Sequence, residues 1–220
     1  MKNKKRIKSI ICICLALLLS ILAVNPQKVE AASTVGILSI ISDGNTDDDW
    51  YGVHSFLLYK NTSKQNQIVA GVKVRPNHSI TIGTYGNKSD GKGVYINLEA
   101  FLATKYGAYS SRVSLSIPVT SSTLKNINYK IKKCNKWTYT NNCSWFAKEV
   151  WNFAAPKSQR ISISFPITPK KLSDIIKKKR NYKNKIALPK VYSAVYRYKT
   201  NNTATHASSS TKKSSSSISK

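Results

Sequence analysis

Alternating apolar and polar residues mark β-strands in the first half of the chain. Residues 51–61 and 66–74 are apolar, β-rich runs, and the polar loop between them predicts a hairpin. Residues 79–86 and 112–118 alternate strictly, and the second of these runs ends at Pro118. Residues 93–101 form a further apolar run after a glycine-rich turn. These patterns predict a mainly antiparallel sheet.

Helical periodicity appears in the second half of the chain. Residues 120–133 begin with Thr and Ser, which favour helix starts, and then place apolar residues on one stripe. Residues 143–155 show a similar stripe, and residues 168–179 start with Thr168 as a cap and Pro169 at the first helical position. Strand patterns return at 160–166 and 190–198. The predicted fold class is α+β, an antiparallel sheet packed with helices. The predicted core positions of the three helices are Leu124, Ile127, Ile131, Phe146, Ala147, Val150, Trp151, Ala154, Leu172, Ile175 and Ile176.

The two ends of the chain differ in composition from the middle. Residues 1–31 have a basic start, an apolar stretch and small residues at Val29 and Ala31, which predict a cleaved secretion signal. An uncleaved membrane anchor is the alternative, because the apolar run is only slightly short of a bilayer span. Residues 32–199 are long enough for a single domain, and the polar residues 200–220 predict a disordered tail. We therefore expect a secreted protein, extracellular or associated with the cell wall.

The charge is strongly positive, at +27 for the whole chain. Removing residues 1–31 takes away six of the 36 basic residues and one of the nine acidic ones, which leaves +22. Such a surface attracts polyanions, so we expect anionic cell-wall polymer or peptidoglycan as the partner, with a membrane surface as an alternative. The basic residues form neither an arm nor a recognition helix, so no specific nucleic acid is expected. We expect a monomer.

Four of the acidic residues lie between positions 43 and 49. Asp43, Asn45, Asp47 and Asp49 alternate as in an EF-hand calcium loop, but Asp48 and His54 replace the glycine and the bidentate glutamate of that loop. A flexible acidic loop attracted to the basic body is the interpretation we favour over a calcium site. No metal or cofactor is expected.

Cys143 stands at the start of a predicted helix, behind Asn141 and Asn142, which are both good caps. Free backbone N–H groups and the helix dipole stabilise a thiolate there, and the same N–H groups suit the oxyanion of a tetrahedral intermediate. Cys134 is the other cysteine of the mature chain, and a Cys134–Cys143 disulfide is the alternative to a reactive thiol.

A cysteine nucleophile needs a base, and the chain offers His54, His78 and His206. His206 lies in the predicted disordered tail and His78 in a turn. His54 lies at the start of a predicted strand, on the face of Phe56 and Leu58, where an imidazole can be held rigidly. If His54 is the base, its ring should lie within roughly 4 Å of the Cys143 sulfur.

Residues 141–146, Asn-Asn-Cys-Ser-Trp-Phe, resemble the nucleophile motif of papain-like peptidases of the NlpC type and of the lecithin:retinol acyltransferase-like branch. His54 precedes Cys143 by 89 residues, an order similar to that of the circularly permuted members, in which the histidine-bearing strand comes before the cysteine-bearing helix. The resemblance covers residues 50–155. It implies a permuted papain-like fold and a secreted bacterial member.

The resemblance also implies roles for particular residues. Cys143 would be the nucleophile and His54 the general base, with Glu99 favoured as the third catalytic residue over Thr81 and His78, because a carboxylate best stabilises an imidazolium. Tyr139 resembles an upstream tyrosine that adds to the oxyanion hole. Asn142 directly precedes the nucleophile. Trp145 stands where the family motif has a small residue, and its side chain would narrow the substrate groove or shield the thiol.

The expected function is a cysteine hydrolase or acyltransferase that acts on an amide or ester through an acyl-Cys143 intermediate. Cell-wall peptides are the expected substrate, by analogy with NlpC-type enzymes, and lipid esters are second. The alternative is a non-catalytic cationic module that binds anionic wall polymer or a membrane surface. Its support is the charge, the twelve tyrosines and the four tryptophans.

Overall fold

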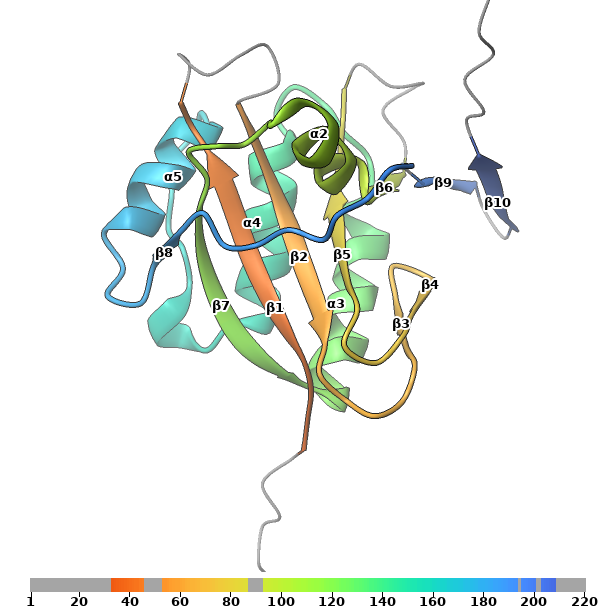
Figure 1. The fold of residues 1–220 in the computed structure, drawn as a ribbon. Helices are drawn as coiled ribbons and strands as arrows, with labels where there is room; N and C mark the ends of the chain where they lie inside the picture. The colour runs from red at the N-terminus through yellow and green to blue at the C-terminus, as the bar shows by residue number, and fades with distance from the viewer. Residues whose placement is uncertain (1–32, 46–52, 87–92, 194, 201–202, 209–220) are drawn as a thin grey trace, which may run out of the picture. The chain divides into compact units, whose positions relative to one another are not determined.

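The computed structural model describes residues 33–45, 53–86, 93–193, 195–200 and 203–208, with side chains as far as Ser193 (Figure 1). The predicted signal at 1–31 and Asp47, Asp48 and Asp49 of the acidic loop lie outside these residues. The fold is α+β, as predicted, with an antiparallel sheet and helices on both of its faces. Within the described residues, no helix is long and apolar enough to cross a membrane.

The strands of the described residues form one large sheet and one small hairpin. The large sheet has the order β10-β9-β6-β5-β2-β1-β7-β8, and each of its pairings is antiparallel. Its strands are β1 Thr34–Asp43, β2 His54–Asn61, β5 Ser79–Gly83, β6 Val94–Ile96, β7 Val113–Thr120, β8 Lys183–Asn184, β9 Val195–Thr200 and β10 Thr203–Ser208. The hairpin consists of β3 Gln67–Val69 and β4 Val72–Val74.

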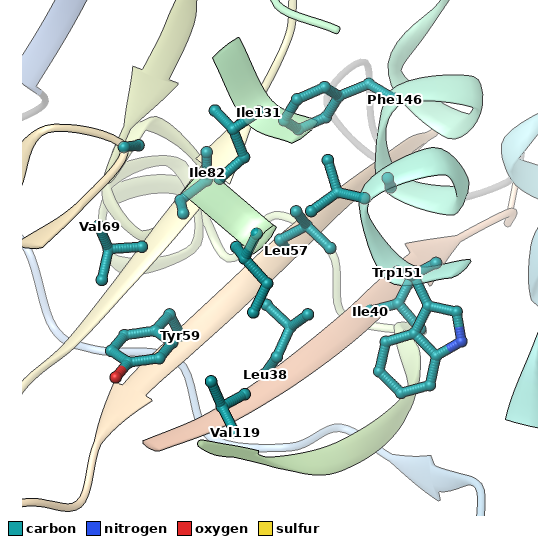
Figure 2. Packing of buried hydrophobic residues seen from close by; sticks show 14 of the residues in the cluster. Leu38, Ile40, Leu57, Tyr59, Val69, Ile82, Val119, Ile131, Phe146 and Trp151 are labelled. Carbon is teal, nitrogen blue, oxygen red and sulfur yellow. The ribbon is translucent and has the colours of Figure 1, made fainter. Parts of the chain in front are cut away.

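The main core lies between the sheet and three helices on one face, α3 Ser121–Lys133, α4 Cys143–Ala154 and α5 Pro169–Lys177. Figure 2 shows Leu38, Ile40 and Leu57 of the sheet pointing toward Phe146 and Trp151 of α4. All of these side chains are fully buried. Burial of this apolar surface is the main force that holds α4, and therefore Cys143, against the sheet.

Helix α2, Leu98–Tyr106, covers the opposite face of the sheet (Figure 1). A smaller cluster of Ile41, Phe56 and Leu58 lies under Leu102 and Ala103 of this helix. The segment that follows β8 also crosses this face, and its Ile186 and Leu188 pack on the same cluster. The sheet is therefore the middle layer of the fold, and side chains of both faces meet at the start of β2.

The three predicted helices are confirmed, with their caps. The side chains of Thr120, Asn142 and Thr168 each accept a hydrogen bond from a backbone N–H in the first turn of their helices. Pro169 is the first residue of α5, as predicted. Two of the predicted core positions, Ala154 and Ile175, are partly buried and pack against the core. The other nine are buried: Leu124, Ile127, Ile131, Phe146, Ala147, Val150, Trp151, Leu172 and Ile176.

The strand pairing differs from the prediction. Residues 51–61 and 66–74 do not form a hairpin with each other: β2 pairs with β1 and β5, and residues 66–74 contain the separate β3–β4 hairpin. β7 continues through Pro118 to Thr120, because β8 pairs only with Val113 and Ser114 and leaves that side of Pro118 at an edge.

Three further segments differ from the predicted elements. Residues 93–101, predicted as a strand, hold β6 and the first residues of α2. Residues 160–166 do not join the sheet, since the backbone N–H and C=O of Ile161 bond to the Asn152 side chain of α4. Residues 203–208 of the predicted disordered tail form β10, which pairs with β9. Residues 209–220 lie outside the described residues.

Candidate active site

Cys143 is the first residue of α4, and its position is fixed by Asn142. The Asn142 Oδ1 atom accepts a hydrogen bond from the Trp145 N–H at 3.0 Å, and its Nδ2 donates to the carbonyl of Ile167 at 2.7 Å. Backbone N–H groups of a first helical turn have no partner within the helix. The N–H of Cys143 is therefore suited to an oxyanion that forms beside the thiol.

His54 is the first residue of β2, where its Cα lies opposite that of Asp43 on β1. Its ring stacks on Tyr85 with 4.4 Å between centroids and lies 5.9 Å from the ring of Phe56 on the same face. Burial lowers the pKa of the His54 imidazole, the nearby Cys143 side chain raises it, and His54 Nε2 lies 3.3 Å from Glu99 Oε1. The imidazole therefore lies between the thiol and the carboxylate.

Glu99 is in the first turn of α2 and is fully buried. Thr81 donates a hydrogen bond from Oγ1 to Glu99 Oε2 at 2.6 Å, and the Tyr85 hydroxyl donates to Oε1 at 3.1 Å. With His54 Nε2, these donors engage both carboxylate oxygens, as a buried charge requires. Asn97, which precedes α2 with a left-handed φ of 62°, turns the chain so that Glu99 faces the sheet.

Gly83, the last residue of β5, makes room for the carboxylate. A Cβ atom at this position would overlap Glu99 Oε1 and would come within 3.1 Å of His54 Nε2. The backbone φ of Gly83 is not in the left-handed region, so the requirement for glycine is one of space. The contact between the imidazole and the carboxylate therefore depends on this glycine.

The electrostatics of the pair favour the thiolate and the imidazolium. Burial alone would raise the pKa of Cys143, but the charge of His54 and hydrogen bonds from His54, the Ser55 backbone and Ser144 lower it below its ordinary value. Burial alone would lower the pKa of His54, but the Cys143 charge and hydrogen bonds to Cys143 and Glu99 raise it from 6.5 to about 9. Each group thus stabilises the charged form of the other.

A row of serine hydroxyls supports the start of α4. Ser144 Oγ lies 2.9 Å from Ser55 Oγ on β2, which lies 2.8 Å from Ser42 Oγ on β1. Ser42 also donates to the carbonyl of Pro169 at the start of α5 at 2.8 Å. This row ties the beginnings of both helices to the two central strands.

Two tyrosines cover the imidazole on the α2 face. Tyr85 and Tyr109 lie with their hydroxyls 3.4 Å apart, and the Tyr109 ring centroid is 5.9 Å from that of His54. Burial, followed by the charge of Glu99, raises the pKa of both phenols, so they remain neutral donors. They shield the His54–Glu99 contact from water and so strengthen it.

The other candidates from the sequence lie in different settings. The Tyr139 side chain is 84% exposed, so a place in the oxyanion hole would require it to turn inward when substrate binds. Asn142 uses both polar atoms for internal bonds, and Trp145 is partly buried against the main core. His78 is exposed in its turn, where Nδ1 lies 2.9 Å from the carbonyl of Pro76. Thr81 contacts Glu99 instead of the imidazole.

Cys134 and Cys143 are both free thiols. Cys134 is buried in the main core at the end of α3, and burial raises its pKa. Within the described residues, no group of three or more His, Cys, Asp or Glu side chains is placed to hold a metal ion. Asp43 instead accepts hydrogen bonds from the backbone N–H groups of Asn45 and Ser111.

The supporting residues around this trio were not predicted. Tyr85, Tyr109, Gly83, Ser42 and Ser55 belong to strands or loops whose side-chain directions depend on register, and Ser144 on α4 contacts them through Ser55. Only the alternation along β5 carries a signal: Thr81 and Gly83 lie two residues apart and share a face of the strand, and Tyr85 follows two residues beyond its end. No family model, curated protein or solved structure matches the chain. The papain-like resemblance accordingly stays an interpretation of the residues.

Proposed function

We propose that this protein is a cysteine hydrolase or acyltransferase that acts on an amide or ester through an acyl-Cys143 intermediate. The observation that carries the proposal is the trio of a partly exposed Cys143 with a buried His54 and a buried Glu99, in which the thiol pKa is lowered and the imidazole pKa is raised to about 9. The order of these residues along the chain also fits the circularly permuted papain-like fold that the sequence resembles.

The chemistry follows from the geometry of the three side chains. The Cys143 thiolate attacks the substrate carbonyl carbon, and the backbone N–H of Cys143 stabilises the oxyanion. The His54 imidazolium gives its proton to the leaving amine or alcohol, so that the acyl-enzyme forms with His54 neutral. His54 then takes a proton from water or from an acceptor alcohol or amine, which attacks the acyl group and releases Cys143. Glu99 holds the ring in orientation and stabilises its charged form.

The proposed substrate is the peptide part of a bacterial cell wall, and the proposed location is outside the cell. The net charge of +22 after removal of residues 1–31 would concentrate the protein on an anionic wall. Within the described residues, seven basic and no acidic side chains fall between positions 177 and 190, which adds local support for this attraction.

The test is the release of new amino groups from purified peptidoglycan by the wild type and by Cys143→Ala. We expect hydrolysis by the wild type, none by Cys143→Ala, and equal wall binding by both proteins. Cys143 should also react with iodoacetamide at neutral pH faster than Cys134, whose pKa is raised.

The second candidate function is a cationic module that binds anionic wall polymer or a membrane surface without catalysis. The basic run at 177–190 favours it, and it requires no reactive thiol. Equal, slow labelling of the two cysteines, with salt-sensitive wall binding and no hydrolysis of peptide or ester, would favour this module over the hydrolase.

A further inference from the structure

Helices α4 and α5 begin at the same end of the sheet, and hydrogen bonds join their first residues. Asn142, directly before Cys143, donates to the carbonyl of Ile167, which lies two residues before Pro169. The row of Ser144, Ser55 and Ser42 ends on the carbonyl of Pro169 itself. The first turn of α5 is therefore a direct neighbour of the thiol's own helix start.

A cavity of about 410 Å³ lies along α5, from Lys170 in its first turn to Lys177 at its last residue. Gly44 and Asn45 form one wall, and Gly44 directly follows Asp43, whose Cα is the partner of His54. Opposite residues of an antiparallel pair lie about 4.5–5.5 Å apart between Cα atoms, and consecutive Cα atoms about 3.8 Å apart. Gly44, which forms part of the cavity wall, is therefore the next residue in the chain after Asp43, whose Cα faces that of His54.

The lining of this cavity is polar throughout. Besides Gly44 it consists of Asn45, Ser111, Lys170, Ser173, Asp174 and Lys177, so no aliphatic or aromatic side chain contributes to it among the described residues. An acyl chain would gain less by entering than in an apolar pocket, because most of the surface that it would contact is polar. A polar group of a substrate can instead exchange its hydrogen bonds with water for bonds to these side chains.

Among the described residues of the lining, the charges sum to one positive charge. Lys170 Nζ forms an ion pair with Asp174 Oδ2 at 3.2 Å along α5. Lys177 lies one turn further on and has no carboxylate within salt-bridge distance among the described residues. The Lys177 ammonium group is therefore available to bind a ligand. A carboxylate matches it, because a carboxylate carries the opposite charge and accepts hydrogen bonds.

We propose that this cavity is a subsite of the Cys143 site and that it binds a carboxylate-bearing part of a peptide substrate, with Lys177 as its cationic contact. The inference rests on the proposed hydrolase function and deepens it, because it favours peptides over lipid esters. Lys177 favours the binding of substrates that carry a carboxylate, and it takes no part in the chemical step at Cys143.

The experiment compares two matched peptides, one with a free terminal carboxylate and one with a carboxamide in its place. In the wild type, kcat/KM should be about two- to five-fold higher for the carboxylate peptide, as expected for an ion pair with the exposed Lys177. Lys177→Gln should remove this preference, so that kcat/KM is the same for the two peptides. Lys132→Gln, an exposed lysine in the last turn of α3, is the matched control and should behave as the wild type.

A binding measurement separates this subsite from the proposed function. The affinity of both peptides for full-length Cys143→Ser is measured by calorimetry, with and without Lys177→Gln. A carboxylate preference that depends on Lys177 supports the subsite, even if the wild type hydrolyses neither peptide and the hydrolase proposal fails. Hydrolysis without a carboxylate preference, or a preference that survives Lys177→Gln, overturns the subsite and leaves the hydrolase standing.

Discussion

Replacing Glu99 with glutamine tests the role of the carboxylate beside His54 Nε2. A hydrogen bond to a charged group contributes about 1.5–3 kcal/mol, and one pKa unit corresponds to about 1.4 kcal/mol. The pKa of His54, now raised to about 9, should therefore fall by roughly one to two units in Glu99→Gln. A less basic imidazole stabilises the thiolate less, so the pKa of Cys143 should rise at the same time.

The assay is the rate at which iodoacetamide modifies Cys143, followed across pH and separated from Cys134 by peptide mass spectrometry. In Glu99→Gln the rate profile should shift to higher pH, because a raised thiol pKa leaves less thiolate at any pH near that pKa. The alkaline limit of any hydrolytic activity should also move down, because the imidazolium is lost as pH rises through the pKa of His54.

The matched control for this substitution is Glu149→Gln. Glu149 lies on the same helix as Cys143 but pairs with Lys130 and Lys148, away from the imidazole. Its variant should keep the wild-type profile. Overlapping profiles for the wild type and Glu99→Gln, in a variant whose circular dichroism is native, would refute the coupling of Glu99 to the thiol.

Three further substitutions or measurements bear on the fold and the site. Gly83→Ala should displace the Glu99 carboxylate and lower kcat, with the thiol labelling profile shifted to higher pH as in Glu99→Gln; unchanged kinetics would contradict the close approach. Trp151→Ala should lower the free energy of unfolding by about 3–5 kcal/mol in urea titrations, because this side chain is fully buried; a change under about 1 kcal/mol would contradict its place in the core. Cys134 should stay unlabelled by iodoacetamide until the protein is unfolded, since burial shields it and raises its pKa; labelling in the native state would contradict this.

The helices that carry the candidate site could be predicted because their signals are local. Thr120, Asn142 and Thr168 are caps within three residues of the N–H groups that they bond, and the apolar stripes repeat with the helical period. The face of His54 followed from the same kind of reasoning, since Phe56 lies two residues further along β2 and its ring lies near the imidazole.

The parts that could not be predicted depend on contacts between distant segments. β1 was not among the predicted strands, and its place between β2 and β7 depends on pairing with strands that are distant in the sequence. Helix α2 has apolar residues all around it and begins after Asn97 without a side-chain cap, so its sequence carries neither a stripe nor a start signal. Glu99 was favoured on chemical grounds, and no spacing in the sequence indicated that it would lie under Gly83.

The placement of the trio on two layers has a consequence for how the protein would lose activity. Cys143 belongs to the helix layer of the main core, whereas Glu99 belongs to α2 on the opposite face, and His54 at the start of β2 lies between them. α2 is short, and its contact cluster is much smaller than the main core. Local opening of α2 should therefore require less free energy than global unfolding. A molecule with an intact main core and a detached α2 would be folded by most measures and inactive, which makes α2 docking a point where temperature, denaturant or a ligand can switch the site off.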